Sequence, residues 1–426
     1  MKPVLLVSGR DPRDEPSGGH SSYVRTHALA ARRAGFEPHL VCVGKTAREE
    51  EAEFGWIHRV RAIARPYRQH LIALHGPVLT REAVRLASRY PAPLLIHGFG
   101  VWGYAAVAAE RHLRSTGHEA AALLSSYTTY AAEANSQVAG IGLTFGRLMR
   151  WRFAARHFVK RSATGPYERT AYEGARLVLY NYESTRRLVA AAYGEGIRMR
   201  RALYAPSSAF GPAPSLADPA PPDLERLGPA TAPLVVSVSR HQPRKGVDVL
   251  LRALAALRSR GVPFRAYLAG DGELLKEHRL LTERLDLSPS VLVAGTIPSV
   301  AGMLARGDLF VLPSRREQSG SLALLEALQA GLPAVASACD GIPEDVVHGE
   351  SAWLVPPGDD GALADAMVRL LSDTALRARL ARGAREAFAA RFSADAFAAD
   401  LRSAYEEVLE AVGRGRQAPE VELAGR

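Results

Sequence analysis

The sequence predicts an α/β protein made of two Rossmann-like domains, each with a parallel sheet. Short apolar runs with the length of buried strands alternate with helical patterns along the whole chain. The stretch from Pro206 to Pro233 contains eight prolines and divides the chain near its middle. The length of 426 residues exceeds what one ordinary core needs and suits two domains.

The composition is that of a globular protein, with 47% hydrophobic and 23% charged residues. No apolar run approaches the roughly 20 residues that a membrane-spanning helix needs. The first residues, MKPVLLVSGRDP, become polar too early for a signal peptide and favour a first strand. Cys42 and Cys339 lie in apolar, strand-like runs and offer neither a disulfide framework nor a metal set. We therefore expect a cytoplasmic protein.

Positive charge is concentrated in the first half of the chain. The residues up to Pro212 contain 30 Lys and Arg against 16 Asp and Glu, a net charge of +14, whereas the remainder has a net charge of −4. Arginine-rich surfaces attract phosphate, as found in nucleic acid, anionic lipid or a phosphorylated acceptor. An arginine-rich proteome is the alternative explanation.

The first domain is expected to span residues 1–205, with strands at 4–8, 38–43, 93–97 and 121–126. The loop after the first strand ends in Ser17-Gly18-Gly19-His20, directly before a helical pattern. Paired glycines at such a place let the backbone approach a ligand closely, and the helix N-terminus attracts an anion.

A basic segment, Gly146–Arg161, places six Lys and Arg among three aromatic residues. Such a segment can lie on an anionic membrane surface. A core helix with a solvated basic face is the alternative that we prefer.

The proline-rich residues 206–233 are predicted to be an extended linker between the domains. The second domain is expected at residues 234–392. An amphipathic helix at 393–413 is expected to cross back to the first domain, and the tail 414–426 to be mobile.

The strongest functional signal lies in residues 305–345. An apolar strand at 309–312 is followed by a polar loop and by a helix at 321–330, which Gly331 ends. In a doubly wound sheet, ligands bind at the loop after a strand's carboxyl end, where the next helix directs its free N–H groups. Glu317 and Glu326 bracket this junction, and a carboxylate there can accept hydrogen bonds from two sugar hydroxyls. These residues predict a nucleotide or polyol site.

A second turn carries two cations. Arg240 and Lys245 follow the strand at 234–239 and precede a helix that begins near Gly246. A cation pair at a helix N-terminus suits a diphosphate, whose charge is spread over several oxygens. Two exposed cations in an ordinary turn are the alternative. Asp271 and Glu273 superficially resemble a metal site, but we expect Asp271 to cap the next helix instead.

The segments EALQAGLPAVAS and GIPEDV resemble the nucleotide-binding signature of the family 4 retaining glycosyltransferases, which have the two-domain GT-B architecture. The resemblance covers essentially the whole chain and is strongest in the second domain. The family's signature places seven residues between two glutamates, whereas eight separate Glu317 from Glu326. Either Glu317 keeps the first position across a one-residue bulge, or Gln318 occupies it.

The resemblance implies that Arg240 and Lys245 neutralise the leaving nucleoside diphosphate and that Glu326 holds the ribose. Glu317 or Gln318 would hold the donor sugar, and the departing phosphate would be the base for the acceptor hydroxyl. Thr296 and Ile297 would hold the base of the nucleotide through backbone groups, with a UDP-sugar favoured as donor. The remaining donor-binding positions that it implies are Gly18, Gly19, Ser319, Gly320, Ser321 and Leu322.

Two further positions are compared with the family's first domain. His97, in LLIHGFGVWG, matches a histidine at a strand end, where a structural role and a cleft-facing role are equally open. Tyr127 stands where many relatives have a histidine near the donor sugar. A phenol can donate a hydrogen bond but does not titrate near neutral pH, so Tyr127 would position substrate without acting as a base.

We therefore predict a retaining glycosyltransferase that needs no metal or cofactor. Its expected partners are a nucleotide-sugar donor and a small-molecule, glycan or lipid-linked acceptor, without nucleic acid. Contact of the basic N-terminal domain with the inner membrane face is a further hypothesis. The alternatives are a GT-B epimerase or phosphorylase, and an inactive nucleotide-sugar-binding subunit.

Overall fold

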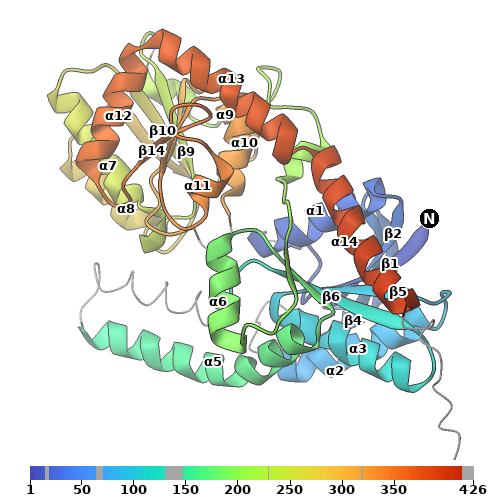
Figure 1. Cartoon of the computed structure of the whole chain (residues 1–426). Coiled ribbons are helices and arrows are strands. Elements are labelled where there is room, and N and C mark those ends of the chain that lie inside the picture. The colour runs from blue at the N-terminus through green and yellow to red at the C-terminus, as the bar shows by residue number, and fades with distance from the viewer. Residues whose placement is uncertain (15–18, 64–70, 130–146, 229, 318–319, 415–426) are drawn as a thin grey trace, which may run out of the picture. The chain divides into compact units, whose positions relative to one another are not determined.

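The computed structural model describes residues 1–14, 19–63, 71–129, 147–228, 230–317 and 320–414. Its chain divides into two compact units, which we call the first and second domains (Figure 1). The first consists of Met1–Ala132, Ala155–Tyr204 and Phe397–Arg426, and the second of Glu133–Ala154 and Ala205–Ala396.

The first domain contains, in its described part, an eight-stranded sheet with the order β3-β4-β2-β1-β5-β6-β7-β8. Only β3 runs antiparallel to its neighbour. The strands are β1 (Lys2–Val7), β2 (Phe36–Gly44), β3 (Arg48–Ala52), β4 (Gly55–Arg61), β5 (Leu94–Phe99), β6 (Ala120–Ser126), β7 (Leu177–Tyr180) and β8 (Met199–Arg201). The helices are α1 (Gly19–Arg33), α2 (Ile72–Ala87), α3 (Gly103–Ser115), α5 (Arg147–Gly174), α6 (Glu183–Tyr193) and α14 (Ala394–Arg414), with a 3-10 turn η2 (Gly100–Trp102).

The strands predicted near residues 4, 38, 93 and 121 are β1, β2, β5 and β6. Residues 4–7 and 40–43 are buried throughout, as expected of central parallel strands that helices cover on both faces. The predictions missed β3, because its sequence REEEA has no apolar pattern. A charged strand at the edge of a sheet opposes pairing with another chain, which explains why such residues are tolerated there.

The C-terminal helix α14 packs in the first domain, where Figure 1 shows it in red beside β1, β2 and β5. Its apolar side buries Phe397, Leu401 and Tyr405. Its acidic side pairs with β8, because Asp400 lies 2.9 Å from Arg200. The last segment of the chain is therefore a structural part of the domain that begins it.

The second domain is built on six parallel strands in the described residues, with the order β11-β10-β9-β12-β13-β14. These strands are β9 (Leu234–Val238), β10 (Arg265–Ala269), β11 (Val291–Gly295), β12 (Leu309–Leu312), β13 (Ala334–Ser337) and β14 (Trp353–Val355). The strand order reverses between the neighbours β9 and β12. Ligands of doubly wound sheets bind at such a switch point, beyond the carboxyl ends of the strands.

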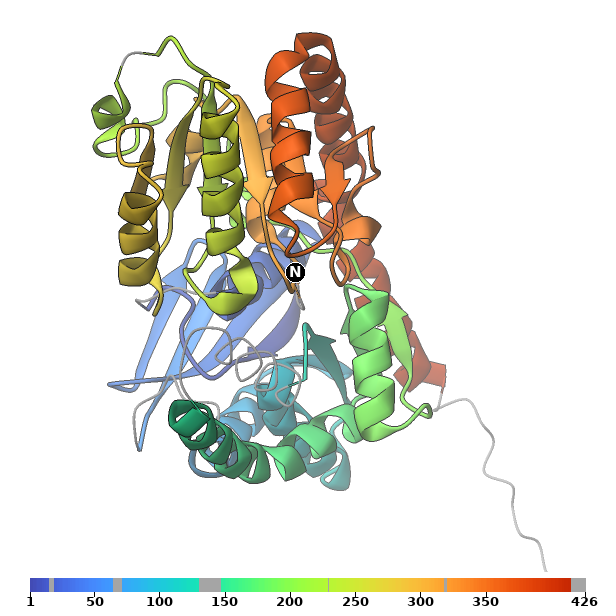
Figure 2. The ribbon, with the colours of Figure 1, turned by 90° about the vertical axis from the view of Figure 1, so that its left-hand side faces the viewer.

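Helices cover both faces of this second sheet. They are α7 (Val247–Ser259), α8 (Leu275–Arg284), α9 (Val300–Leu304), α10 (Leu322–Ala330), α11 (Ile342–Asp345), α12 (Asp360–Ser372) and α13 (Thr374–Arg391), and 3-10 turns occur at η3 (Ser207–Phe210), η4 (Leu224–Leu227) and η5 (Pro243–Lys245). Helices α7 and α12 pack side by side (Figure 2).

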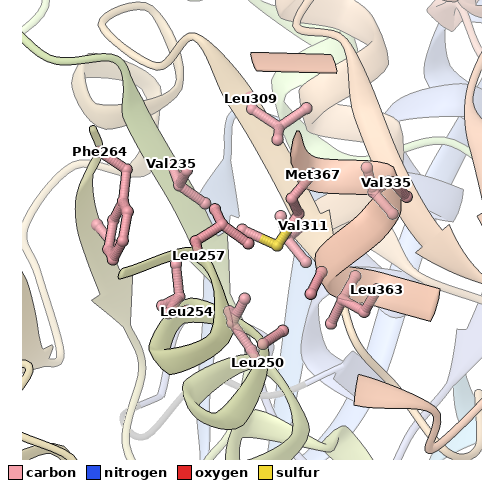
Figure 3. Packing of buried hydrophobic residues seen from close by; sticks show 14 of the residues in the cluster. Val235, Leu250, Leu254, Leu257, Phe264, Leu309, Val311, Val335, Leu363 and Met367 are labelled. Carbon is pink, nitrogen blue, oxygen red and sulfur yellow. The ribbon is translucent and has the colours of Figure 1, made fainter. Parts of the chain in front are cut away.

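The core of the second domain forms where α7 and α12 meet the sheet. Leu250, Leu254 and Leu257 extend from α7 toward Val235 and Val311 of the strands (Figure 3). Leu363 and Met367 of α12 close the same cluster, which also contains Phe264, Leu309 and Val335. The repeat of apolar residues at three and four positions in each helix explains why one side of it is buried. This packing holds β9 and β12, and hence the loops that follow them.

Residues 206–233, predicted as a linker without a core of its own, pack against the second domain. The Tyr267 hydroxyl donates to the Pro222 carbonyl at 2.8 Å, and Arg306 donates to the carbonyls of Asp218 and Leu216 at 3.0 Å each. The prolines explain the irregular course of this segment. Its packing depends on Tyr267 and Arg306, which lie far along the sequence.

Within the described residues, no helix is both long enough and apolar enough to cross a bilayer.

Candidate functional site

The turn after β9 presents the predicted cations. Its residues Pro243–Lys245 form the 3-10 turn η5, and Gly246, with φ of 64°, begins α7. A β-carbon on Gly246 would lie 2.0 Å from the Pro313 carbonyl oxygen, so only glycine allows this close approach. The turn after β9 and the loop after β12 are therefore packed backbone against backbone.

Glu317, in the loop after β12, is the centre of a polar cluster. Its side chain is 1% exposed and forms an ion pair with Lys245. Ser314 donates its hydroxyl to Glu317 Oε1 at 2.7 Å, and Arg244 Nη1 lies 3.8 Å from Oε2. The Glu317 backbone N–H donates to Asp340 Oδ2 at 2.5 Å. The structure therefore brings together Lys245 and Glu317, two of the three residues that were predicted to be catalytic.

Lys245 is enclosed, with a side chain 13% exposed. Burial lowers the pKa of its ammonium group, and the Glu317 carboxylate opposes that shift. The expectation that Lys245 is an exposed turn residue is wrong, because the loop after β12 covers it. Its enclosure gives the ammonium a fixed position beside the switch point.

Arg240 stands apart from this cluster. It is exposed at the start of the turn and forms no ion pair with the described residues. An exposed arginine at this position keeps its five donors for an anion.

Glu326 lies on α10, one turn beyond the helix start. Burial raises its pKa to about 7. Among the described residues, no cation or hydrogen-bond donor pairs with its carboxylate. Such a carboxylate suits a ligand that brings its own hydroxyl donors, as a ribose does.

The start of α10 is arranged as the sequence predicts. Ser321 is its N-cap, and the Ser321 hydroxyl accepts from the Leu324 N–H at 3.2 Å. Gly320 has φ of 88° and Gly331, with φ of 66°, ends the helix. Leu322 is the first helical residue. Gln318 and Ser319 lie outside the described residues.

The predicted base-holding residues Thr296 and Ile297 follow β11, and Thr296 is exposed. The carbonyls before them are already engaged. Arg279 donates to the Val293 and Ala294 oxygens at 3.0 Å each, and Gly270 N–H donates to the Gly295 oxygen at 2.7 Å. The backbone groups of Thr296 and Ile297 are the next ones along this turn.

Asp271 does not cap the following helix. Its side chain accepts from the neighbouring Gly272 N–H at 2.8 Å, and α8 begins four residues after Asp271 without a side-chain cap. The prediction failed because the Gly270–Glu273 turn is longer than a cap requires. The Asp271 backbone carbonyl instead accepts from His241 N–H at 2.9 Å and so supports the turn after β9.

His97 of the first domain is a structural residue. The ring is fully buried, and its Nδ1 and Nε2 each lie 2.8 Å from a hydroxyl, those of Tyr405 and Ser125. Burial, with the nearby His27, lowers the pKa of His97 well below its usual value. Both nitrogens are occupied within the domain, which favours the structural one of the two roles that the sequence left open. Its partner Tyr405, more than 300 residues away in sequence, could not be foreseen from a strand-end pattern.

Tyr127 has the opposite character. Its hydroxyl is buried without a hydrogen-bond partner among the described residues, and its ring lies 3.9 Å from that of Tyr23. Burial raises the pKa of Tyr127 well above its usual value, which excludes a role as base near neutral pH. The neutral phenol can still donate or accept a hydrogen bond.

The predicted glycine pair in the first loop is only partly described. Gly19 is the first residue of α1, and Gly18 lies outside the described residues. His20 follows, with Nε2 at 3.1 Å from the Ser8 hydroxyl at the end of β1.

The part of the chain that holds the site is similar to known proteins. Residues 232–373, which hold every element of the Lys245–Glu317 cluster, match the model of the family described as "Glycosyl transferases group 1". The second domain belongs to the glycosyltransferase group 1 family. For these residues, the family predicted from the sequence is confirmed.

A curated protein that is similar in sequence agrees with this family match. The chain is 37% identical over 181 residues to the lipopolysaccharide core biosynthesis glycosyltransferase LpsD of Rhizobium meliloti, a match that covers 42% of this chain and 51% of that protein. The chain thus spans about half the length of the curated relative that it matches.

Solved structures extend the likeness to both domains. Sucrose-phosphate synthase from Thermosynechococcus elongatus superimposes with a TM-score of 0.70 at 21% identity, covering 96% of this chain and 100% of that one. HepE of Anabaena, solved in complex with UDP-glucose, gives 0.67 at 19% identity with 96% and 100% coverage. The predicted α/β fold with two parallel-sheet domains, GT-B, is confirmed.

Sequence reasoning missed three members of the cluster in the glycosyltransferase group 1 domain. Arg244 lies beside the predicted Lys245, Ser314 follows Pro313, and Asp340 follows β13. Asp340 could have been found, because a polar residue after the neighbouring strand's carboxyl end lies at the same edge of the sheet. Nothing in the sequence assigned Ser314 to Glu317.

Proposed function

We propose that the chain transfers a sugar from a nucleotide-sugar donor to an acceptor hydroxyl, with retention at the anomeric carbon. The observation that supports this most is an ion pair. It joins Lys245, in the turn after β9, to Glu317, in the loop after β12. It places a held cation at the switch point of a glycosyltransferase group 1 domain, where a diphosphate would bind.

In this proposal Lys245 and Arg240 stabilise the negative charge that develops on the diphosphate as the glycosidic bond breaks. Glu317 holds the Lys245 ammonium at its place and favours its charged form. The free N–H groups at the start of α10 add further donors to the phosphate. The departing phosphate removes the proton of the acceptor hydroxyl, since neither His97 nor Tyr127 has the properties of a base. No step requires a metal, so we expect turnover to persist in the presence of a chelator.

The donor is proposed to be a UDP-sugar. Glu326 would accept the two ribose hydroxyls, and the backbone of Thr296 and Ile297 would hold the base. The solved complex of HepE with UDP-glucose supports the choice of uridine. The acceptor is proposed to be a glycan or lipid-linked sugar, because the relative LpsD is named for lipopolysaccharide core biosynthesis.

A donor panel tests the proposal. UDP, GDP and ADP and their glucose derivatives would be added to the protein, because a ligand that binds the folded state raises the melting temperature by mass action. We expect the largest rise with uridine compounds and slow hydrolysis of the matching donor when acceptor is absent. Binding without any turnover would favour the inactive subunit, and no binding by any member of the panel would contradict the proposed function.

The spacing question has its own test. Glu317→Gln should lower turnover by about 10²-fold, because it removes the carboxylate that holds Lys245. Gln318→Ala should lower donor affinity if Gln318 contacts the donor sugar. A larger loss of turnover with Gln318→Ala than with Glu317→Gln would assign the first position of the signature to Gln318.

A further inference from the structure

The two loops that carry Lys245 and Glu317 are joined by a second ion pair behind them. Arg315 places Nη1 2.6 Å from Asp248 Oδ1 and Nη2 2.8 Å from Oδ2. A guanidinium that meets both oxygens of a carboxylate in this way is held in distance and in orientation. Asp248 lies in the first turn of α7, three residues after Lys245, and Arg315 lies two residues before Glu317.

The same arginine also fixes the backbone of the turn. Arg315 Nη1 donates to the Pro243 carbonyl at 3.2 Å. The backbone N–H groups of Arg315 and Arg316 donate to the Arg244 carbonyl at 2.8 and 3.2 Å. These bonds join the turn after β9 to the loop after β12. They therefore fix the distance between the loops that carry Lys245 and Glu317.

The pair stays charged near neutral pH. Burial raises the pKa of Asp248, but hydrogen bonds and charge from Arg315 and Arg252 outweigh it and lower the pKa to about 2. The two side chains are about one quarter exposed, 25% for Arg315 and 28% for Asp248, so water only partly screens them.

We propose that Asp248 and Arg315 are positioning residues that set the relative placement of Lys245 and Glu317. Their hydrogen-bond partners among the described residues lie within the two loops and on α7, so they act on the site through the chain. Their role in turnover rests on the proposed function, whereas their role in holding Lys245 does not. We call the Asp248–Arg315 ion pair the clamp. A displacement of about 1 Å at a reacting group can cost 10²-fold in rate, so loosening the clamp should lower turnover although no contact to substrate is lost.

Arg252 supplies a matched control. It donates to Asp248 Oδ2 at 2.8 Å and lies 3.6 Å from Asp360, so it belongs to the same charge cluster. In the part of the chain that the structure describes, Arg252 has no hydrogen bond or ion pair to the turn after β9 or to the loop after β12. Arg252→Gln therefore removes one cation from Asp248 and leaves the hydrogen bonds of Arg315 between the two loops intact.

The first experiment measures Lys245 directly and needs no substrate. The chain has five lysines, so acetylation by an N-hydroxysuccinimide ester can be followed at each one by peptide mass spectrometry. We expect Lys245, which Glu317 and burial protect, to react at least tenfold faster in Arg315→Gln than in the wild type. Exposed Lys276 should react equally in both and serves as the internal standard, and Arg252→Gln should leave Lys245 protected.

The second experiment separates placement from folding. Arg315→Gln should lower kcat by about 10-fold to 100-fold with a smaller change in donor KM, while Arg315→Lys, which can form one of the two bonds, should lie between. The double variant Asp248→Asn/Arg315→Gln should have a kcat no lower than that of the less active single variant, because the two side chains act as one unit. If Arg315→Gln does not fold, Arg315→Lys serves in both experiments.

The outcomes are distinct. Lys245 protection equal to wild type in a folded Arg315 variant would overturn the clamp, as would equal effects of Arg315→Gln and Arg252→Gln. Faster acetylation in Arg315→Gln together with no turnover of any nucleotide-sugar by the wild type would uphold the clamp and contradict the proposed function.

Discussion

At the scale of single residues, Lys245 and Glu317 each determine what the other can do. The carboxylate is enclosed and needs a cation beside it, and the ammonium needs an anion to stay charged in a buried place. In the proposed function the pair therefore serves folding and catalysis together. Replacing either residue should affect both properties, and a measurement of one alone would be misleading.

Lys245→Ala should lower turnover by about 10²-fold or more, the scale of losing one preorganised donor to developing charge. It should also lower the free energy of unfolding by about 1–3 kcal/mol, because Glu317 stays buried with fewer partners. Steady-state kinetics and urea unfolding of the same sample would measure the two effects. Lys276→Ala, an exposed lysine on α8, is the control. Near-normal turnover in folded Lys245→Ala would remove Lys245 from the mechanism.

The raised pKa of Glu326 predicts that donor binding depends on pH. Burial raises its pKa to about 7, so the carboxylate that we propose as acceptor of the ribose hydroxyls becomes fully ionised only above that pH. Donor affinity should therefore rise between about pH 6 and 8, and Glu326→Gln should bind weakly without this rise. Isothermal titration at each pH would show it. An unchanged pH profile in Glu326→Gln would exclude Glu326 as the titrating group.

The same group affects stability with the opposite sign. In the unfolded chain Glu326 titrates near its usual pKa, so between that pH and about 7 the folded state binds more protons. Its contribution to stability is present at low pH and is lost as the pH rises toward 7. The difference in melting temperature between wild type and Glu326→Gln, both without ligand, should follow this course.

At the scale of elements, α14 links two distant parts of the sequence. Tyr405 donates to or accepts from His97 at the end of β5, and the His97 ring continues through Ser125 to His27 of α1. These groups join two helices to two strands through a buried polar chain. Since each member has a partner, the chain stabilises the domain only while it is complete.

Tyr405→Phe should therefore lower the stability of the first domain by about 1 kcal/mol or more, because it leaves His97 Nδ1 buried without a partner. Turnover at saturating donor should stay at the wild-type value, since His97 is structural. Urea unfolding and kinetics would measure these two quantities. Tyr267→Phe removes a comparable hydroxyl bond in the second domain and is the control. A loss of turnover in stable Tyr405→Phe would return His97 to the site.

The elements around the site could be predicted because their signals are local. The apolar run of β12, the Ser321 cap and Gly331 at the end of α10 each follow from a few neighbouring residues. The Lys245–Glu317 pair could not be predicted as a contact, because 72 residues separate its members. Sequence reasoning reached each residue from its own loop, and the resemblance to a family added the expected roles. It left the role of His97 open, because the partner Tyr405 lies on a helix more than 300 residues away.

At the scale of the whole molecule, the net charge of +14 before Pro212 has no assigned partner. The basic segment at 146–161 overlaps the start of α5, and the side chains of its first arginines lie outside the described residues. Helix α5 has one described aromatic residue in this region, Phe158, which is 71% exposed. An exposed aromatic ring among arginines is compatible with contact to a lipid surface.

If this segment contacts anionic lipid, sedimentation with phosphatidylglycerol vesicles should weaken steeply as salt rises from low to physiological concentration. The reason is screening, since the Debye length falls to roughly 8 Å at 0.15 M. Changing Arg147, Arg150, Arg152 and Arg156 to Gln should abolish sedimentation and leave donor affinity unchanged. Absence of sedimentation by the wild type at low salt would favour a soluble acceptor.

The return of the chain to its first domain has a consequence for synthesis on the ribosome. The second domain consists of Glu133–Ala154 and Ala205–Ala396, so all its residues precede Phe397, whereas the first domain also needs α14. A nascent chain that has reached residue 396 holds every residue of the later domain but lacks the helix that covers Phe36 and His97 in the earlier one. Domains usually mature in the order in which they emerge. Here the order is reversed, because the first domain stays incomplete until α14 has been made, after every residue of the second domain.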